Sequence, residues 1–213
     1  VKMTAKGFLP MELVKDVYSQ GLMKEYFIDK YKKNKTLREL DSYTVHLTRL
    51  LLEVAGLTKK RKGKLSLTKK GEELINDPHG LLIHLLGAIS FRFNLGYFDG
   101  YGQNNIGRLG WAFTVILLSK YGRTERPEFF YAEKHFNAFP AMVNEAESHF
   151  SHDQQITAYR CYSLRTFEHF LQHLGVINLI FERYFDEVRF ISATDLLWQM
   201  FKVDIPNMAK GRN

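Results

Sequence analysis

The sequence predicts a mainly helical protein with small β-hairpins, and three observations lead to this fold class. Apolar residues recur at helical spacing near both ends and in the middle of the chain. Apolar and polar residues alternate on both sides of Lys62-Gly63, which is typical of a hairpin. The order helix, glycine, strand, turn, strand, helix occurs in residues 42–74 and again in residues 163–201. With 213 residues, 45% of them hydrophobic, the chain can build real cores.

Residues 1–78 form the first of three predicted regions. Apolar residues between Leu9 and Tyr31 indicate one or two short helices. A further helix is predicted to begin at Asp41 or Ser42, either of which suits an N-cap, and to run to Ala55 before a left-handed stop at Gly56. Helical spacing divides this segment into a buried stripe of Leu47, Leu50, Leu51 and Val54 and an opposite face of Ser42, His46, Arg49 and Glu53.

The stretch GLTKKRKGKLSLTKKGEEL, residues 56–74, is predicted to form a hairpin that turns at Lys62-Gly63 and a helix that begins at Thr68. It resembles the C-terminal half of a winged helix-turn-helix domain, in which a Gly-Leu pair, a basic hairpin and an LT-x-x-G segment follow one another. The matching residues are Gly56, Leu57, Leu65, Thr68 and Gly71. The resemblance covers residues 13–74 and implies a winged-helix-like basic domain. The segment KNKTLRELDSYT departs from the family pattern, because it shows neither a clear first helix nor a tight turn.

Residues 79–153 form the second predicted region, which is helical and aromatic. LLIHLLGAISFRFNL and LGWAFTVILLSKYG are apolar on most faces, and we expect both to be buried. Phe91, Leu95 and Phe98 follow helical spacing, so core packing is the favoured role for the aromatic cluster. A stacking platform for single strands, built from Phe91, Phe93, Tyr97, Phe98 and Tyr101 with Arg92, is the alternative. The polar stretch 144–155 is the predicted boundary of this region.

Residues 154–213 repeat the order of predicted elements in the first region and are predicted to form a second winged-helix-like part. A helix over residues 163–174 ends at Gly175, two strands follow, and a last helix covers residues 194–201. The second hairpin carries Glu182, Asp186 and Glu187 against Arg183 and Arg189, so we expect it to differ in role from the first. The order of parts, including RTFEHFLQHLGVINL, resembles the C-terminal region of an uncharacterised plasmid ORF-three-like family. That resemblance implies little about mechanism.

Positive charge is concentrated in the first hairpin and the start of the next helix. Between Lys59 and Lys70 the chain has seven basic residues and no acidic one, and without these seven it holds 23 basic and 23 acidic residues. The net charge of +7 is therefore local, which favours binding to nucleic-acid phosphates. The predicted contacts with double-stranded DNA are Ser42, Tyr43, His46, Arg49, Lys59, Lys60, Arg61, Lys62, Lys64, Lys69 and Lys70.

In the winged-helix interpretation the helix from Ser42 enters the major groove and the hairpin reaches flanking phosphates. Arg49 and His46 are then the residues expected to read base edges, whereas Ser42 and Tyr43 lie nearer the backbone. Cations in the first turn of a helix are disfavoured by its dipole, so a nearby anion would relieve the cost of Lys69 and Lys70.

Other chemistry has weaker support in the sequence. His169 and His173 lie four residues apart on a predicted helix and are weak candidates for a metal site, with a half-buried helix face as the favoured alternative. A second weak candidate is the polar cluster of Glu145, Glu147, His149, His152 and Asp153, for which ordinary solvation is the favoured alternative. Cys161 has no assignable histidine and carboxylate partner and fits a packed thiol. P-loop, G-x-G-x-x-G and G-x-S-x-G motifs are absent. We therefore expect no cofactor and no enzymatic activity.

A protein-interaction module or homodimer is the competing functional hypothesis. It rests on the weakly charged tip of the second hairpin, where Tyr184 and Phe185 would serve as interface anchors. A single cysteine and the lack of a signal peptide or a long apolar run lead us to expect a cytoplasmic protein without a membrane span. The chain opens on Val1 instead of methionine, which fits a fragment of a longer protein.

Overall fold

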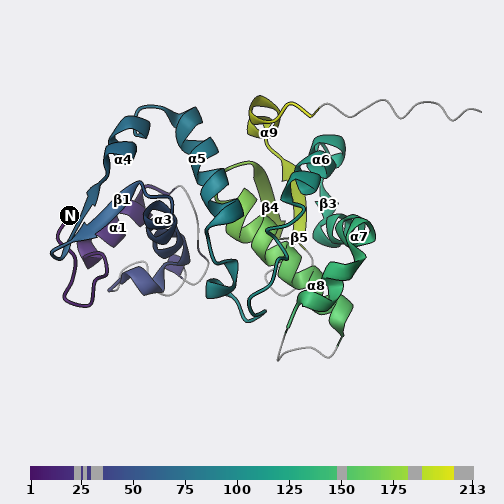
Figure 1. Cartoon of the computed structure of the whole chain (residues 1–213), viewed down its shortest axis with the longest axis horizontal. Coiled ribbons are helices and arrows are strands. Elements are labelled where there is room, and N and C mark those ends of the chain that lie inside the picture. The colour runs from purple at the N-terminus through teal and green to yellow at the C-terminus, as the bar shows by residue number, and fades with distance from the viewer. Residues whose placement is uncertain (22–24, 26–27, 30–35, 148–152, 182–188, 204–213) are drawn as a thin grey trace, which may run out of the picture. The chain divides into compact units, whose positions relative to one another are not determined.

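The computed structural model describes residues 1–21, 25, 28–29, 36–147, 153–181 and 189–203 of the chain (Figure 1). These residues form two compact units, Val1–Asn94 and Leu95–Asn213. The sequence predicts three regions, with boundaries after residues 78 and 153, and the division between the two compact units lies after Asn94, inside the predicted middle region. None of the helices in the described ranges has the length and apolar character that a membrane span requires.

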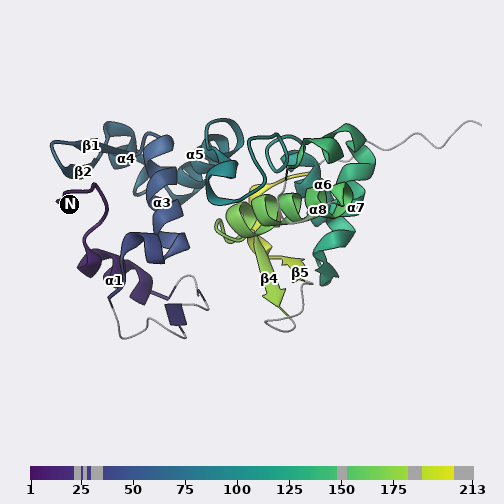
Figure 2. The same ribbon diagram turned by 90° about the horizontal axis from the view of Figure 1, so that it is seen from below.

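The first unit is mainly helical with one hairpin, as the sequence predicts. The helices that the structure bounds in this unit include α1 (Met11–Ser19), α3 (Tyr43–Val54), α4 (Lys69–Leu74) and α5 (Pro78–Phe91), and a 3-10 turn, η1 (Glu39–Asp41), precedes α3. Strands β1 (Thr58–Arg61) and β2 (Lys64–Leu67) pair antiparallel and lie beside α4 (Figure 2). The short turn η1 is all the regular structure that residues 36–42 contain, in keeping with the weak helical pattern there.

Side-chain caps explain where the helices of this unit begin. The Ser42 hydroxyl accepts a hydrogen bond from Val45 N, the Thr68 hydroxyl accepts one from Gly71 N, and Asp77 accepts one from Gly80 N. The predicted starts at Ser42 and Thr68 are confirmed, as is the left-handed Gly56 after α3, with φ of +71°. A cluster of buried apolar side chains supports α1 and α3; it consists of Met3, Leu9, Val14, Ile28, Leu37 and Val45.

Gly71 shows why the hairpin and α4 approach each other so closely. A Cβ atom on this residue would lie 2.1 Å from the Leu57 carbonyl oxygen, and no side chain can occupy that position. The same carbonyl accepts hydrogen bonds from the backbone and hydroxyl of Thr68. The glycine in the LT-x-x-G segment therefore lets α4 pack directly on the backbone that leads into β1.

The second unit consists of helices around a small antiparallel sheet. The helices are α6 (Trp111–Tyr121), α7 (Glu128–Ala138), α8 (Gln154–Ser163) and α9 (Asp195–Met200), with 3-10 turns η2 (Leu95–Phe98) and η3 (Pro140–Glu145). Strands β4 (Ile177–Phe181) and β5 (Arg189–Ala193) form the predicted hairpin, with Gly175 at φ of +69° before it. Strand β3 (Arg126–Pro127) adds a third strand on the far side of β5, which the sequence pattern did not indicate.

The predicted helix over residues 163–174 is instead the continuation of α8 by a π-helical segment, η4 (Leu164–Leu171). Arg165 projects from η4 and is completely buried. Its guanidinium donates to both carboxylate oxygens of Asp99 at 2.7 and 2.9 Å, to Asn104 Oδ1 at 2.6 Å and to the Gly102 carbonyl at 2.6 Å. The glycine-rich connection after η2 is thus held against the centre of the unit by one arginine.

The aromatic cluster of the middle region is not one helical face. Helix α5 ends at Phe91, whose side chain is 78% exposed, while Phe93 and Leu95 are buried and Tyr97 is 63% exposed. The division between the two units falls after Asn94. The expectation that Phe91 packs in a core with Leu95 and Phe98 is therefore wrong, because the helix that would align them stops too early.

Candidate nucleic-acid interface

The turn of the first hairpin has a tight and defined geometry. Arg61 and Lys64 are the last paired residues, and Lys62 and Gly63 between them have φ values of +50° and +69°. Two successive residues with positive φ are the mark of a type I′ turn, which matches the natural twist of antiparallel strands. The basic tip is consequently part of a regular hairpin whose side chains point in alternating directions.

The start of the chain pairs with the hairpin as an additional edge. Met3 N donates to the Gly63 carbonyl, and Val1 and Leu65 exchange backbone hydrogen bonds, each at 2.8 Å. These bonds place Lys2 opposite Lys64 in an antiparallel bridge. No pattern in the sequence relates Lys2 to Lys64, which lies 62 positions away. Lys2 was therefore not among the predicted DNA contacts.

The alternation of side chains gives the hairpin two chemically different faces. On the inner face Lys60 lies opposite Leu65, which packs against the buried cluster of the first unit. On the outer face Arg61 lies opposite Lys64, which in turn lies opposite Lys2, and Lys59 lies opposite Ser66. We call the exposed residues Lys2, Lys59, Arg61, Lys64 and Ser66 the outer face.

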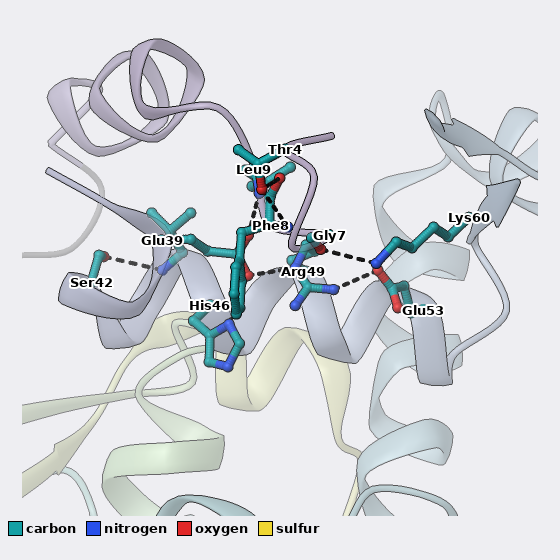
Figure 3. Close-up of polar contacts among 11 residues, drawn as sticks. Thr4, Gly7, Phe8, Leu9, Glu39, Ser42, His46, Arg49, Glu53 and Lys60 are labelled. Carbon is teal, nitrogen blue, oxygen red and sulfur yellow. Dashed lines mark hydrogen bonds and ion pairs between the residues drawn. The ribbon is translucent and has the colours of Figure 1, made fainter. Parts of the chain in front are cut away.

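Lys60 is exposed as well, but it lies on the inner face and its side chain turns back to the protein. Its ammonium group donates to the Gly7 carbonyl at 3.0 Å, as Figure 3 shows. Gly7 has φ of +78°, and a Cβ atom there would lie 2.1 Å from the Lys60 nitrogen. The sequence places Lys59 and Lys60 in one basic run, whereas the structure assigns them to opposite faces.

Helix α4 carries the remaining two predicted phosphate contacts. Lys69 and Lys70 are both exposed in its first turn, directly after the Thr68 cap. Lys70 forms an exposed ion pair with Glu73 at 3.4 Å. Exposed ion pairs of this kind contribute little free energy, so a phosphate could replace Glu73 as the partner of Lys70.

The four predicted contacts on α3 have a different environment from the hairpin. Ser42 is completely buried, His46 is 6% exposed and Arg49 is 7% exposed, while Tyr43 is half-buried. Ser42 caps α3 and also donates to Glu25 Oε1 at 2.6 Å, and Tyr43 N donates to Glu25 Oε2 at 2.9 Å. These contacts show Ser42 and the Tyr43 backbone engaged in holding the start of the helix.

Glu39 explains why the polar face of α3 is buried. Its Oε1 atom accepts from Arg49 Nε at 2.5 Å and bonds His46 Nδ1 at 2.7 Å, and its Oε2 atom accepts from Leu9 N at 2.5 Å (Figure 3). Burial alone would raise the pKa of Glu39, but the hydrogen bonds from Leu9, His46 and Arg49 lower it, so the carboxylate is held ionised. Glu53 Oε1 binds the other side of Arg49 at 2.6 Å.

The predicted polar row of Ser42, His46, Arg49 and Glu53 therefore does not form an open surface, because its first three residues are buried. Leu47 and Leu51 are buried as predicted, but Leu50 is half-buried and Val54 is 37% exposed. Helical spacing correctly predicted that these polar residues share one side of the helix. It could not predict that the buried carboxylate of Glu39 would bind two of them inside the unit.

The weak metal candidates do not come together in the part of the chain that is described. No group of three histidine, cysteine or carboxylate side chains there is arranged to hold a metal ion. His169 is 6% exposed, and burial lowers its pKa to about 4. His173 is half-buried, Asp153 caps α8, and Glu145 accepts from Asn105 N; Glu147 is exposed, and His149 and His152 lie outside the described residues.

Two further predictions concern the second unit. Cys161 is completely buried, and burial raises the pKa of its thiol to about 12, as expected for a packed residue. Tyr184 and Phe185, the anchors of the protein-interaction hypothesis, lie outside the described residues. That hypothesis rests on the sequence alone.

One comparison with known proteins gives a match. Residues 1–80 match the profile of a family described as the Y4jL N-terminal domain. The matched range ends shortly after α4 and contains the whole hairpin. No curated protein and no solved structure matches the chain.

Proposed function

We propose that the first unit binds the phosphate backbone of nucleic acid, in the first instance double-stranded DNA, and catalyses no reaction on it. The observation that carries this proposal is the outer face of the hairpin. Four exposed cations, Lys2, Lys59, Arg61 and Lys64, share one side of three paired backbone segments. The hairpin and its turn contain no acidic residue that could neutralise them.

The arrangement suits phosphates better than base edges. Arginine and lysine on a twisted ribbon provide charge over an extended surface, which is what a regular array of phosphates requires. Direct reading of bases needs side chains that can reach a groove, and His46 and Arg49 are instead bound to Glu39 inside the unit. The proposal therefore assigns affinity to the outer face and to the exposed Lys69 and Lys70 on α4, and expects little sequence preference from α3.

A relation to winged helix-turn-helix domains stays part of the proposal. A helix, a glycine stop, a basic hairpin and a second helix follow one another in the first unit, as the family pattern requires. The burial of Arg49 argues that such a domain would use its hairpin more than its helix. Contact with DNA through the hairpin would then be accompanied by little preference for one DNA sequence over another.

The test is fluorescence anisotropy of a labelled random-sequence 30-base-pair duplex, titrated with the full chain at several salt concentrations. Each phosphate contact contributes about 0.9 to the slope of log affinity against log salt. A variant with Lys59→Gln, Arg61→Gln and Lys64→Gln should lower that slope by up to about 2.7. An unchanged slope in a variant that remains folded by circular dichroism would remove the outer face from the binding site.

A further inference from the structure

Three cations in the second unit converge on two aromatic rings. Lys120 and Tyr121 end α6, Arg126 lies in β3, and Phe130 and Lys134 belong to α7. The Tyr121 ring centroid is 5.2 Å from Lys120 Nζ, 5.5 Å from Arg126 Cζ and 5.2 Å from Lys134 Nζ. Phe130 is 4.7 Å from both Arg126 Cζ and Lys134 Nζ, and the two rings meet edge to face at 5.2 Å.

The rings explain how these cations are positioned but leave their charge in place. A ring face attracts a cation through its quadrupole and carries no net charge, so three like charges remain around the same two rings. Within the described ranges, no carboxylate lies at ion-pair distance from Lys120, Arg126 or Lys134. Two other arginines of the same unit are neutralised: Arg165 by Asp99, and Arg189 by Glu128 and Glu168.

The environment of Arg126 adds a second observation. Its Nε atom is buried and has no hydrogen-bond acceptor among the residues that the structure describes. The described residues therefore do not hold the Arg126 guanidinium through this nitrogen, and its other N–H groups are the ones that would donate to an anionic oxygen. Glu133 directly precedes Lys134 on α7, but it forms no ion pair with the three cations among the described residues.

We propose that Lys120, Arg126 and Lys134 form a second phosphate-binding site, here called the ring-held cation site, and that its ligand is a phosphodiester group of the nucleic acid. A planar guanidinium with two ammonium groups is a suitable donor set for phosphate oxygens. The naming of nucleic acid as the source rests on the proposed function, whereas the affinity for phosphate rests on the geometry of this site alone. Each unit then makes its own contact with the backbone.

The test compares two double variants of the full chain in the duplex titration. Lys120→Gln with Lys134→Gln removes two cations of the ring-held cation site, and Arg123→Gln with Lys202→Gln removes two exposed cations of the same unit outside it. Arg123 lies 4.4 Å from the Trp198 ring and belongs to a different contact. The first variant should lower the salt slope by about 1.8 and the second by much less.

Equal slopes for the two double variants would overturn the inference. A lowered slope in the first double variant, combined with no effect of the triple hairpin variant, would support the ring-held cation site and reject the hairpin proposal. Isothermal titration with inorganic pyrophosphate examines the other source of phosphate. If pyrophosphate binds and only Lys120→Gln with Lys134→Gln abolishes that binding, while duplex binding is unaffected, the site serves a small phosphate and the nucleic-acid assignment is overturned.

Discussion

Lys59 and Lys60 are consecutive residues on β1, yet their side chains project from opposite faces of the hairpin. Lys60 lies opposite Leu65 and donates to the Gly7 carbonyl at 3.0 Å, whereas Lys59 lies opposite Ser66 on the outer face. The two residues have the same charge and adjacent places in the chain. They therefore separate the effect of charge in general from the effect of a particular surface.

Glu39 is expected to be essential for the stability of the first unit. Glu39→Gln keeps the shape of the side chain but removes the negative charge beside Arg49, which is buried. Breaking a buried ion pair from one side costs about 3–5 kcal/mol. Urea unfolding followed by circular dichroism should show this loss.

The matched control for Glu39 is Glu53→Gln. Glu53 also binds Arg49, at 2.6 Å, but its side chain is 28% exposed. Water can replace much of its contribution, so the expected cost is about 1 kcal/mol or less. If both variants lost the same amount, Glu39 would have no special place in the buried network.

Gly71 is expected to tolerate no side chain. In Gly71→Ala the new methyl group would lie 2.1 Å from the Leu57 carbonyl oxygen, so α4 must move away from the hairpin. Overpacking of this kind costs roughly 3 kcal/mol. The free energy of unfolding, measured by circular dichroism in urea, gives the cost.

Gly87 in α5 provides the opposite case. An added Cβ atom there meets no heavy atom within 4 Å. Gly87→Ala should therefore stabilise the protein by about 0.5–1 kcal/mol, because alanine is the better helix former. Destabilisation by Gly87→Ala, or no effect of Gly71→Ala, would contradict the packing described for these helices.

His135 should make the second unit less stable in mild acid. The residue is completely buried and stacks on Tyr162 at 4.4 Å, and burial lowers its pKa to about 4, from an ordinary value near 6.5. Well above pH 6.5 the histidine is neutral in both the folded and the unfolded state, so its protonation does not affect stability there. As the pH falls from 6.5 to 4 only the unfolded chain takes up the proton, so stability is lost over that window.

The variant His135→Phe tests this prediction, because phenylalanine cannot be protonated. The drop in stability between pH 7 and pH 5 should be roughly 2 kcal/mol smaller in the variant than in the original chain. Both tryptophans, Trp111 and Trp198, belong to the second unit, so their fluorescence follows its unfolding in urea. An identical pH dependence in the two proteins would show that His135 is not the residue that responds.

Local signals in the sequence predicted much of the fold. Ser42 and Thr68 cap their helices, Lys62-Gly63 forms the turn, and Gly56 and Gly175 end helical segments, each because its preference is set within a few residues. Contacts between distant segments were not predictable in this way. Strand β3 pairs with β5, which lies more than 60 residues later in the chain, and the residues Arg126 and Pro127 show no pattern that predicts a strand.

The candidate site shows the same division between local and distant information. The basic hairpin was visible as a run of charge, but which lysine faces outward depends on register, and Lys2 joins it only through pairing with Lys64. The burial of His46 and Arg49 depends on Glu39, which the pattern of α3 does not contain. The ring-held cation site gathers Lys120, Arg126 and Lys134 from three elements that are not periodic with one another.

The most direct measurement is the affinity of Lys59→Met and Lys60→Met for the labelled 30-base-pair duplex at low and near-physiological salt. Both changes remove one charge and keep a side chain of similar length. The outer face predicts that Lys59→Met lowers the salt slope by about 0.9 and weakens binding, while Lys60→Met leaves both nearly unchanged. Equal effects of the two substitutions, or no binding of the duplex by the original chain at low salt, would contradict the assignment of the outer face as a phosphate-binding surface.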